Sequence, residues 1–549
     1  MNEQSQTGAT VLLDSLLALG ARMGFGVPGE SYLALLDAMV DRADSFRFIT
    51  CRHEAAAANM AEAYGKLTGA PGLACVTRGP GATHATTGLH TAFQDSTPLL
   101  LLIGQVARAM RGREAFQELD YEKFLSEVTK WTGEVACPDR MAEFAARAWS
   151  TALAGRQGPT ALALPEDVLT AGTDAQPLLP HAPVQAGPDP RAVEDVAAAL
   201  AQARQPLILI GGGPWTADEA AAFTRFAERR SIPVAASFRA QSLIDNESPA
   251  YAGHLGIGAN PALVTRLAAC DLLLVIGPRL GEMTTDGYSR LRPPVPQQPM
   301  IHVHAGAAEP GRVYHAGQRI VCAPGAFAAA LAAADLAGPA GPDRADWAEA
   351  ARADELAWRA PVDNPGDVQL AALYPLLRAA LPEDAIIANG AGNYAAWLHR
   401  FFVYRGFRTQ LAPTSGAMGY SVPAGIAAAL IHPDRPAISV AGDGCFLMSG
   451  NELATAARYG ARTVFLVFNN AMYGTIRMHQ QRHYPGRESG TALTNPDFVA
   501  YAQSFGLEAR RVARTADFAP ALAAALATGG PALIEITVDP RAISPTMRL

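Results

Sequence analysis

The sequence lacks several features that would place it in a simple class. Residues 1–10, MNEQSQTGAT, contain no basic segment ahead of an apolar one, and no stretch of about 18 residues is apolar without a charge or a helix breaker. We therefore expect a cytoplasmic protein with neither a secretory signal nor a membrane span. No two of its six cysteines form a CxxC pair, which favours reduced, buried thiols over a disulfide framework: Cys51, Cys75, Cys137, Cys270, Cys322 and Cys445.

Charge is also scarce in this chain. Only 17% of its 549 residues are charged, and the net charge is −7. A chain without a basic surface is a poor partner for nucleic acid, so we expect a small-molecule ligand instead. Hydrophobic residues make up 49% of the chain, which is enough to build large cores. The length suggests about three domains of roughly 180 residues each.

Apolar runs alternate with Ala-rich helical stretches, such as 54–69, in three blocks of the chain. The expected strands include 72–76 and 98–104 in the first block, 206–213, 231–237, 271–277 and 299–306 in the second, and 384–390, 437–444, 463–470 and 532–539 in the third. This alternation is typical of βαβ units on a parallel sheet, and runs that are apolar throughout indicate sheets covered on both faces. We predict an α/β fold with three doubly wound parallel-sheet domains, at residues 1–175, 191–335 and 362–549. The proline-containing segments 176–190 and 336–347 are the predicted linkers between them.

The third block carries the clearest chemical signal, AGDGCF at 441–446 followed by VFNNAMYG at 467–474. Each motif follows an apolar strand, and we expect a helix over 449–459 between them, ended by Gly460. A right-handed crossover makes the two strands parallel, so Asp443 and the Asn469–Asn470 pair lie at one edge of the sheet.

Carboxylate and amide oxygens are ligands that Mg²⁺ and Ca²⁺ accept, and a helix N-terminus favours an anion. The unit therefore predicts a site for a magnesium-bound diphosphate. The residues alone leave an alternative open, in which Asp443 caps a helix and Asn470 closes a loop.

The spacing of the two motifs adds a resemblance to a known family. Between Gly444 and Asn469 lie 24 residues, which resembles the thiamine diphosphate (ThDP) enzyme signature of GDG, about two dozen residues and NN. The resemblance implies that Asp443, the Asn470 side chain and the Met472 carbonyl hold Mg²⁺, which anchors the cofactor diphosphate. It also implies a set of cofactor contacts: Pro80, Asn393, Tyr394, Gly416, Met418, Gly442, Asp443, Gly444, Cys445, Tyr473 and Gly474.

Met418 and Glu54 have the most specific roles in this resemblance. Met418 would wedge between the two cofactor rings, although a lone Met is more often a core residue. Glu54, in RHEAAAANMAEAYGKLTG (52–69), would contact the cofactor pyrimidine and activate it. The alternative is a purely structural role, in which Glu54 is a first-turn residue that the helix dipole favours. In such relatives the glutamate-bearing and metal-bearing blocks meet across a subunit interface, which implies a homodimer or a homotetramer.

The resemblance covers nearly the whole chain and is closest to the acetolactate synthase group, on residues 72–106 and on EAFQELD at 114–120. It implies a carboligase or decarboxylase acting on a small 2-oxo acid, with Phe116 and Gln117 lining the reaction chamber. Taken singly, these two residues could equally be a core and a surface position. The alternative is a ThDP-dependent lyase or hydrolase acting on an acyloin, a diketone or an acyl-CoA. A third hypothesis is a non-catalytic cofactor-binding scaffold.

Several residues depart from the acetolactate synthase pattern. His84 stands where that group usually has Asn, His479 where it has Trp, and Met283 where an Arg is expected. His84 and His479 are therefore candidate catalytic proton-transfer groups, or else hydrogen-bonded pocket residues. The acceptor substrate stays open.

The middle block resembles the domain that binds FAD in acetolactate synthases. Three glycines at 211–213 follow a strand and could meet a pyrophosphate, but the motif is weak. His302 and His304 stand where flavin-binding members have acidic residues. FAD is therefore a candidate cofactor, which the three glycines favour and the two histidines oppose.

Overall fold

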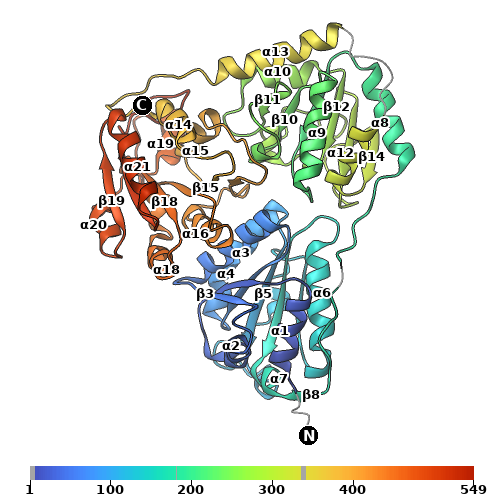
Figure 1. Ribbon diagram of the computed structural model, residues 1–549, viewed down its shortest axis with the longest axis vertical. Coiled ribbons are helices and arrows are strands. Elements are labelled where there is room, and N and C mark those ends of the chain that lie inside the picture. Colours follow the sequence, from blue (N-terminus) through green and yellow to red (C-terminus); the bar gives the residue numbers. More distant parts are fainter. Residues whose placement is uncertain (1–5, 181, 335–341) are drawn as a thin grey trace. The chain divides into compact units, whose positions relative to one another are not determined.

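The computed structural model describes residues 6–180, 182–334 and 342–549. The chain forms two compact units, each assembled from separate stretches of sequence (Figure 1). Unit 1 contains Met1–Val184, Ser415–Asp434 and Cys445–Thr463, and unit 2 contains Gln185–Thr414, Arg435–Gly444 and Val464–Leu549. Among the helices of the described residues, none is both long and apolar enough to cross a bilayer.

Unit 1 is built on a six-stranded parallel sheet with the strand order β3-β2-β4-β5-β7-β6. Its strands are β2 (Met23–Gly26), β3 (Arg47–Thr50), β4 (Gly72–Val76), β5 (Leu99–Gln105), β6 (Trp131–Glu134) and β7 (Pro159–Pro165). A short antiparallel pair joins β1 (Gln6–Thr7) to β8 (Gly172–Thr173). Every residue of β4, β5 and β7 is buried, as expected for a sheet covered on both faces.

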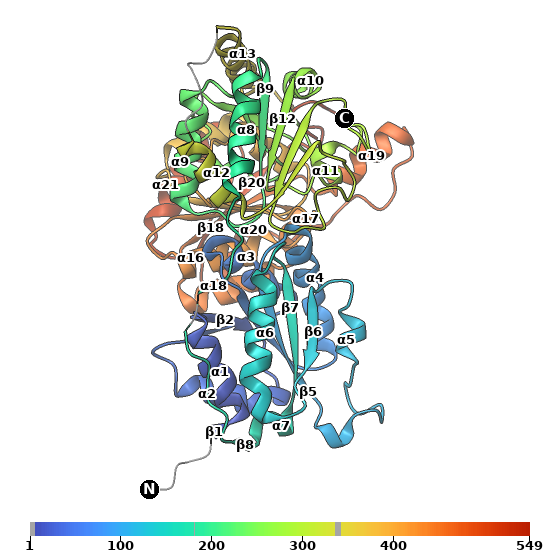
Figure 2. The same ribbon diagram turned by 90° about the vertical axis from the view of Figure 1, so that its right-hand side faces the viewer.

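Helices cover both faces of this sheet. The helices from the N-terminal stretch are α1 (Gly8–Ala18), α2 (Leu33–Val40), α3 (Glu54–Thr68), α4 (Pro80–Asp95), α5 (Tyr121–Phe124), α6 (Met141–Leu153) and α7 (Glu166–Thr170). The α1, α2 and α6 helices share one hydrophobic core with the sheet, and Figure 2 shows α6 lying along the strands. The α3 and α4 helices pack against each other and against β4 and β5.

The later stretches of unit 1 contribute α16 (Ser421–Ile431) and α18 (Leu453–Tyr459). The α16 helix packs along α3, and the Tyr420 hydroxyl donates to the buried Glu62 carboxylate. The Tyr459 hydroxyl accepts a hydrogen bond of 2.8 Å from the Thr50 amide. Segments more than 300 residues apart in the sequence are thus joined in one core.

Unit 2 contains the other two six-stranded sheets. The first has the order β11-β10-β9-β12-β13-β14, with all its pairs parallel: β9 (Pro206–Ile210), β10 (Val234–Ala236), β11 (Tyr251–His254), β12 (Leu272–Ile276), β13 (Met300–His304) and β14 (Gln318–Val321). The second has the order β16-β15-β17-β18-β20-β19: β15 (Ile386–Asn389), β16 (Gln410–Leu411), β17 (Ala437–Gly442), β18 (Thr463–Asn469), β19 (Glu508–Val512) and β20 (Ala532–Thr537).

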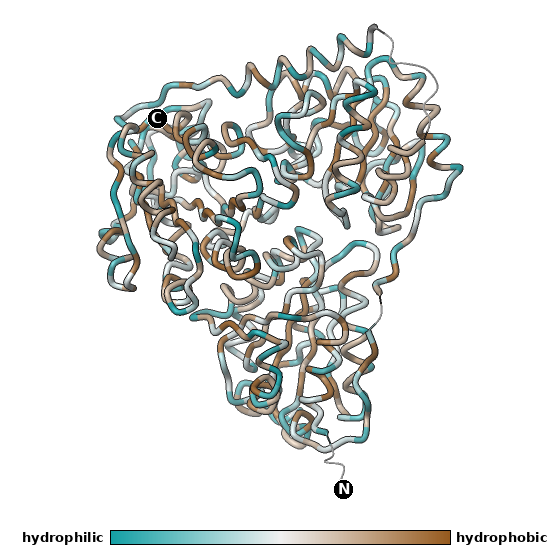
Figure 3. The backbone as a smooth tube through the Cα atoms, in the orientation of Figure 1, coloured by the Kyte–Doolittle hydropathy of each residue, from teal (hydrophilic) through white to brown (hydrophobic). Residues whose placement is uncertain are grey.

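Alternate residues of β9 show how the first of these sheets is covered. Ile208 and Ile210 belong to one hydrophobic core, with α8, α9 and α12, and Leu207 and Leu209 belong to another, with α10 and α13. Such strands are apolar on both faces, and hydrophobic segments run along the strands in Figure 3. The helices around this sheet are α8 (Pro190–Gln202), α9 (Ala217–Arg229), α10 (Pro261–Ala269), α11 (Glu282–Thr285), α12 (Pro324–Ala333) and α13 (Pro342–Trp358).

The C-terminal sheet is accompanied by α14 (Leu370–Ala379), α15 (Tyr394–Phe401), α17 (Asp443–Leu447), α19 (Gly474–His483), α20 (Phe498–Gln503) and α21 (Phe518–Ala527). The α/β class with three parallel sheets is confirmed. The predicted domain boundaries stay a prediction, since the compact units combine the blocks differently.

Two local expectations differ from the structure. The helix expected at 449–459 begins at Leu453, after a separate short helix at Asp443–Leu447, and ends as expected before Gly460 in the left-handed conformation. The predicted linker at 336–347 lies partly outside the described residues, and its remainder belongs to α13.

Candidate active site

In unit 2, the end of β17 holds a buried carboxylate. The strand ends at Gly442 and α17 begins at Asp443, whose side chain is almost inaccessible, with 2% of the residue exposed. Its Oδ1 accepts 2.8 Å from the Gly444 amide, and its Oδ2 accepts 2.8 Å from the Asn495 side-chain amide. Burial raises the pKa of this carboxyl, and the four N–H groups that face it oppose the shift.

The neighbouring strand β18 ends at the asparagine pair, whose two members differ. Asn469 is engaged in the fold: its amide donates 2.7 Å to Glu535, and its Oδ1 accepts 2.9 Å from Asn495. Asn470 makes a local bond, with its Oδ1 accepting 3.2 Å from the Met472 amide. The backbone N–H groups of Ala471 and Met472 face the Asp443 carboxylate and stabilise its charged form. The two motifs therefore lie together at one sheet edge, as the sequence predicts.

Glycines allow two tyrosine rings to approach this strand edge. A Cβ placed on Gly442 would lie 3.0 Å from the Tyr394 ring, and one on Gly444 would lie 2.6 Å from the Tyr473 ring. Contacts that short are not available to an alanine without movement of the ring. Tyr394 is the first residue of α15 and Tyr473 immediately precedes α19, so the loop that leads into α15 and the start of α19 lie against the GDG turn.

A hydrogen bond joins that loop to α19. The Thr475 hydroxyl donates 2.9 Å to Asn393 Oδ1, which fixes the loop beside the N-terminus of the helix. The predicted residues of unit 2 thus gather at one sheet edge: Asn393, Tyr394, Gly442, Asp443, Gly444, Asn470, Met472, Tyr473 and Gly474. His479 lies one turn further along α19, exposed and stacked on His483 with ring centroids 6.2 Å apart.

The donor set at this edge fits a magnesium ion. Asp443 supplies a carboxylate, Asn470 an amide oxygen, and Met472 a backbone carbonyl that also accepts 3.0 Å from the Gly474 amide. These are hard oxygen ligands of the kind that Mg²⁺ takes in small number, leaving positions for phosphate and water. The arrangement can therefore hold a metal-bound diphosphate.

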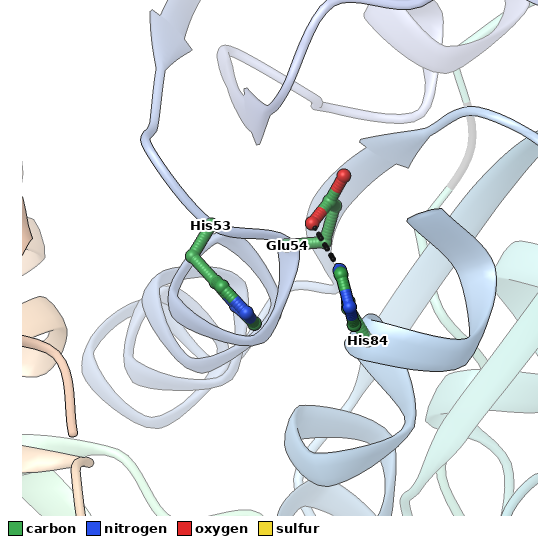
Figure 4. Close-up of side chains that lie close together, drawn as sticks. All are labelled: His53, Glu54 and His84. Atoms are coloured by element: carbon green, nitrogen blue, oxygen red, sulfur yellow. Dashed lines mark hydrogen bonds and ion pairs between the residues drawn. The ribbon is translucent and has the colours of Figure 1, made fainter. Parts of the chain in front are cut away.

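In unit 1, Glu54 is the first residue of α3 (Figure 4). Its Oε2 lies 2.9 Å from His84 Nδ1, and its side chain is 13% exposed. His53 caps the helix through its Nδ1, which accepts 3.1 Å from the Ala55 amide, and its ring stacks on His84 with centroids 4.6 Å apart. Burial, with a smaller contribution from His84, lowers the pKa of His53.

A second carboxylate fixes the backbone that leads to Glu54. Glu452 is fully buried, and its Oε1 accepts from the amides of Arg52 and His53 at 2.9 and 3.0 Å. Its Oε2 accepts from the Thr455 hydroxyl. Because two consecutive N–H groups converge on one oxygen, the chain enters α3 along a defined path.

The loop with Phe116 and Gln117 lies against the turn before α4. A Cβ on Gly79 would lie 2.8 Å from Gln117 Cβ, so Gln117 packs on the Gly79–Pro80 turn. The buried Arg78 donates 3.2 Å to the Phe116 carbonyl. The Phe116 side chain itself is 73% exposed in this unit, which makes a core role for it wrong.

Hydrogen bonds of Gly419 attach the segment with Gly416 and Met418 to residues 445–449. The Gly419 amide donates 3.2 Å to the sulfur of buried Cys445, and its carbonyl accepts 2.8 Å from the Ser449 hydroxyl. Gly416 is exposed with a φ of +69°, and Met418 is half-buried. Met418 is thus not enclosed in the core, and the wedge role stays a prediction.

Comparison with known proteins gives matches along the whole chain. Three family models match: the N-terminal TPP binding domain of thiamine pyrophosphate enzymes at residues 6–124, their central domain at 193–331, and their C-terminal TPP binding domain at 390–536. The chain belongs to the thiamine pyrophosphate enzyme family.

Several relatives of this thiamine pyrophosphate enzyme are acetolactate synthase large subunits. The isozyme 2 large subunit of Escherichia coli (strain K12) is 30% identical over 540 residues, covering 97% of this chain and 95% of that protein. The large subunit of Parasynechococcus marenigrum is 31% identical over 550 residues, covering 97% and 88%. That of Corynebacterium glutamicum is 31% identical over 534 residues, covering 94% and 84%.

In the middle sheet of this thiamine pyrophosphate enzyme, two histidines stand where a flavin-binding member is expected to carry acidic residues. His302 lies in the middle of β13 and His304 ends it, and both are buried. His302 Nε2 donates 2.9 Å to the Pro278 carbonyl, and burial lowers its pKa to about 4, so the ring is neutral near pH 7. A neutral imidazole keeps one nitrogen as a hydrogen-bond acceptor, and the charge of the buried Glu309 acts on His302, so FAD stays a candidate cofactor.

Sequence reasoning missed three residues that support the predicted ones. Asn495 holds Asp443 and Asn469, Glu452 holds the backbone before Glu54, and Thr475 holds Asn393. Each acts through a partner remote in the sequence, so no local pattern points to it.

Proposed function

We propose that this thiamine pyrophosphate enzyme is a ThDP- and Mg²⁺-dependent carboligase of the acetolactate synthase type. It would decarboxylate one small 2-oxo acid and transfer the remaining acyl carbon to a second carbonyl compound. The observation that carries the proposal is the oxygen set of Asp443, Asn470 and Met472 at one sheet edge. The names of the acetolactate synthase relatives, matched over nearly the full chain, support the reaction type.

The residues of unit 2 would bind the charged end of the cofactor. Asp443, Asn470 and the Met472 carbonyl would hold a magnesium ion, whose charge would neutralise a bound diphosphate. Tyr394 and Tyr473 close the glycine turn around it, with the N–H groups at the start of α19 available to a phosphate oxygen. Asn495 keeps the Asp443 carboxylate oriented toward the metal.

The residues of unit 1 would act on the reactive end. Glu54 would contact the pyrimidine and hold or release a proton there, while Met418 and Gly416 would pack against the cofactor rings. Bound ThDP supplies an electron sink for the pair released when the carboxylate of a 2-oxo acid leaves as carbon dioxide. Phe116 and Gln117 line the chamber, and the exposed Phe116 ring excludes water once a second subunit covers it.

The proposed assembly is a homodimer, or a pair of dimers, in the cytoplasm. The supporting observation is exposed apolar surface in unit 1: Phe116, Leu447 and Met448 are all at least 40% exposed. Large exposed apolar side chains are candidates for burial at a subunit interface.

A second candidate is a ThDP-dependent lyase or hydrolase that cleaves an acyloin, a diketone or an acyl-CoA. The observation that favours it is His479, exposed on α19 beside His483 where the acetolactate synthase pattern has an apolar Trp. A polar ring suits a proton transfer to a leaving group better than the binding of a second 2-oxo acid.

Product analysis separates the two candidates. Protein supplied with ThDP and Mg²⁺ is incubated with pyruvate, with pyruvate plus 2-oxobutyrate, or with acetoin. The proposal expects carbon dioxide and acetolactate from pyruvate, and loss of nearly all turnover in Glu54→Gln. Turnover of acetoin alone would establish the second candidate and overturn the first. Equal behaviour of wild type and Glu54→Gln in every assay would reject both.

A further inference from the structure

The two carboxylate oxygens of Glu54 have different surroundings (Figure 4). Oε2 is 2.9 Å from His84 Nδ1. Oε1 faces the first turn of α4, where a Cβ on Gly81 would lie 3.4 Å away. Gly81 has no side chain, so the space beside Oε1 is left open. One oxygen is therefore bound by the protein, and the other is available to a ligand.

Helix packing sets the distance between Glu54 and His84. The α3 and α4 helices approach most closely where a Cβ on Gly88 would lie 2.4 Å from Ala58 Cβ. Ala58 is four residues after Glu54, and Gly88 is four residues after His84, so each contact point lies about one turn along its helix. The close contact aligns the two helices, and one turn earlier the two side chains meet.

Glu54 and His84 differ in their exposure to solvent. The Glu54 side chain is 13% exposed and the His84 side chain is 51% exposed. His84 is thus the member of the pair that solvent reaches more easily. Of the other titratable groups near Glu54, His53 stacks on His84 and its pKa is lowered by burial, while burial raises the pKa of Tyr32 and of Cys51. All three are uncharged near pH 7, which leaves His84 as the proton partner of the carboxyl.

The same atoms could suggest a transition-metal site, since the ligand atoms of His53, Glu54 and His84 lie within 4.8 Å of one another. A metal would have to replace the hydrogen bond between Glu54 and His84, and His53 Nδ1 is occupied by the Ala55 amide. The hydrogen bond is the arrangement that the structure contains.

We propose that His84 is a positioning residue and the proton route for Glu54. Its Nδ1 fixes Oε2, so that Oε1 is presented to the cofactor. When Glu54 is protonated, the carboxyl passes its proton to Nδ1, and His84 releases the proton on Nε2 to water. The carboxylate then accepts from Nδ1–H, and the reverse sequence returns the proton. The inference rests on the proposed function, in which Glu54 contacts the cofactor pyrimidine.

The first test measures the tautomer of His84 without cofactor. Protein labelled with ¹⁵N in its histidine rings is prepared metal-free, and the His84 signal is the one lost in His84→Asn. Wild type should carry the neutral-ring proton on Nδ1, and Glu54→Ala should move the population toward Nε2–H. His90, exposed on the same helix, is the matched control and should not change. A wild-type ring with its proton on Nε2, or a ring unchanged by Glu54→Ala, would overturn the hydrogen-bonded route.

The second test follows hydrogen–deuterium exchange at the cofactor C2 position in loaded enzyme without substrate. His84→Asn and His84→Ala should slow exchange about tenfold or more, with cofactor affinity retained, and added imidazole should restore the rate only in His84→Ala. His90→Asn should exchange like wild type. If Glu54→Gln exchanges normally, the proposed function itself fails. If Glu54→Gln is slow but both His84 variants exchange at the wild-type rate, only the role of His84 is refuted.

Discussion

Asn495 donates its side-chain amide to Asp443 Oδ2 at 2.8 Å and to Asn469 Oδ1 at 2.9 Å, so one side chain connects the ends of two neighbouring strands. A residue in a loop, far from either motif in the sequence, thus orients the proposed metal ligand. Groups that orient a ligand in this way contribute to metal affinity although they do not touch the metal.

Asn495→Leu removes both hydrogen bonds with little change in volume. We expect the Mg²⁺ concentration that half-saturates ThDP binding to rise about 10- to 100-fold. Tryptophan fluorescence during a Mg²⁺ titration measures it. Gln503→Ala, which removes an exposed amide on α20, is the control and should behave as wild type. Equal Mg²⁺ dependence in Asn495→Leu and wild type would show that Asn495 does not orient the ligand.

Asp443→Asn keeps the shape of the ligand and removes its charge. One carboxylate oxygen becomes an NH₂ group that faces the N–H donor of Gly444 or Asn495, so the cofactor-free variant should unfold at a somewhat lower temperature than wild type. Addition of Mg²⁺ and ThDP should raise the melting temperature of wild type, because a ligand that binds the folded state stabilises it. The variant should show little of that increase. A full increase in the variant would contradict the assignment of Asp443 as a ligand.

Glu452→Ala leaves the amides of Arg52 and His53 without their acceptor. A buried donor without a partner costs on the order of 1–3 kcal/mol, so the denaturant midpoint of the variant should fall. Glu452→Gln keeps an acceptor oxygen and should cost less. Glu122→Ala, on the exposed side of α5, is the control. A midpoint for Glu452→Ala that matches the control would show that the hydrogen bonds from Arg52 and His53 to Glu452 add no stability.

The absorbance spectrum of the purified protein tests whether the central sheet binds a flavin. His302 and His304 are buried and offer no carboxylate to a flavin ribose, so we expect no flavin band near 450 nm (an approximate flavin property). Added FAD should leave the melting temperature unchanged. A yellow protein with bound flavin would refute the interpretation of these two histidines.

Buried histidines predict a loss of stability in acid. Burial lowers the pKa of His254 and of His302 to about 4, below the value of about 6.5 in an unfolded chain. The unfolded chain therefore binds protons first, and stability falls as the pH drops from about 6.5 toward 4, by up to roughly 1.4 kcal/mol per pH unit for each histidine. Denaturant midpoints at pH 7.5 and pH 5 measure the loss. His254→Gln combined with His302→Gln should lose less than wild type between these values; an equal loss would assign the acid sensitivity to other groups.

The inner strands could be predicted from the sequence, and some edge strands could not. The apolar run at Gly72–Val76 and the helix at Glu54–Thr68 occur where the sequence places them, because an apolar run fills a covered strand and Gly69 ends the helix in the left-handed conformation. The strands of unit 2 that were not expected are all at sheet edges: β11, β14, β16 and β19. An edge strand has one neighbour, and β19 (EARRV) is mostly exposed, so its composition resembles a loop.

The residues of the site also fall into two kinds, those that a local sequence pattern predicts and those that depend on remote contacts. Asp443 and the asparagine pair carry a signal because their spacing is local, and the structure brings them together at one sheet edge. Asn495 and Glu452 act on partners 52 and about 400 residues away, and such contacts depend on how remote segments pack. The hydrogen bond between Glu54 and His84 belongs to this second kind, since it follows from the approach of two helices.

The central claim is that Glu54 and the Asp443–Asn470 edge serve one cofactor. A crystal structure of the protein with Mg²⁺ and ThDP tests it most directly. We expect the metal to be bound by Asp443, Asn470 and the Met472 carbonyl, and Glu54 Oε1, from this subunit or from a second copy, to lie within hydrogen-bond distance of the pyrimidine ring. A cofactor bound elsewhere, or bound with no Glu54 carboxyl beside its pyrimidine, would contradict the account.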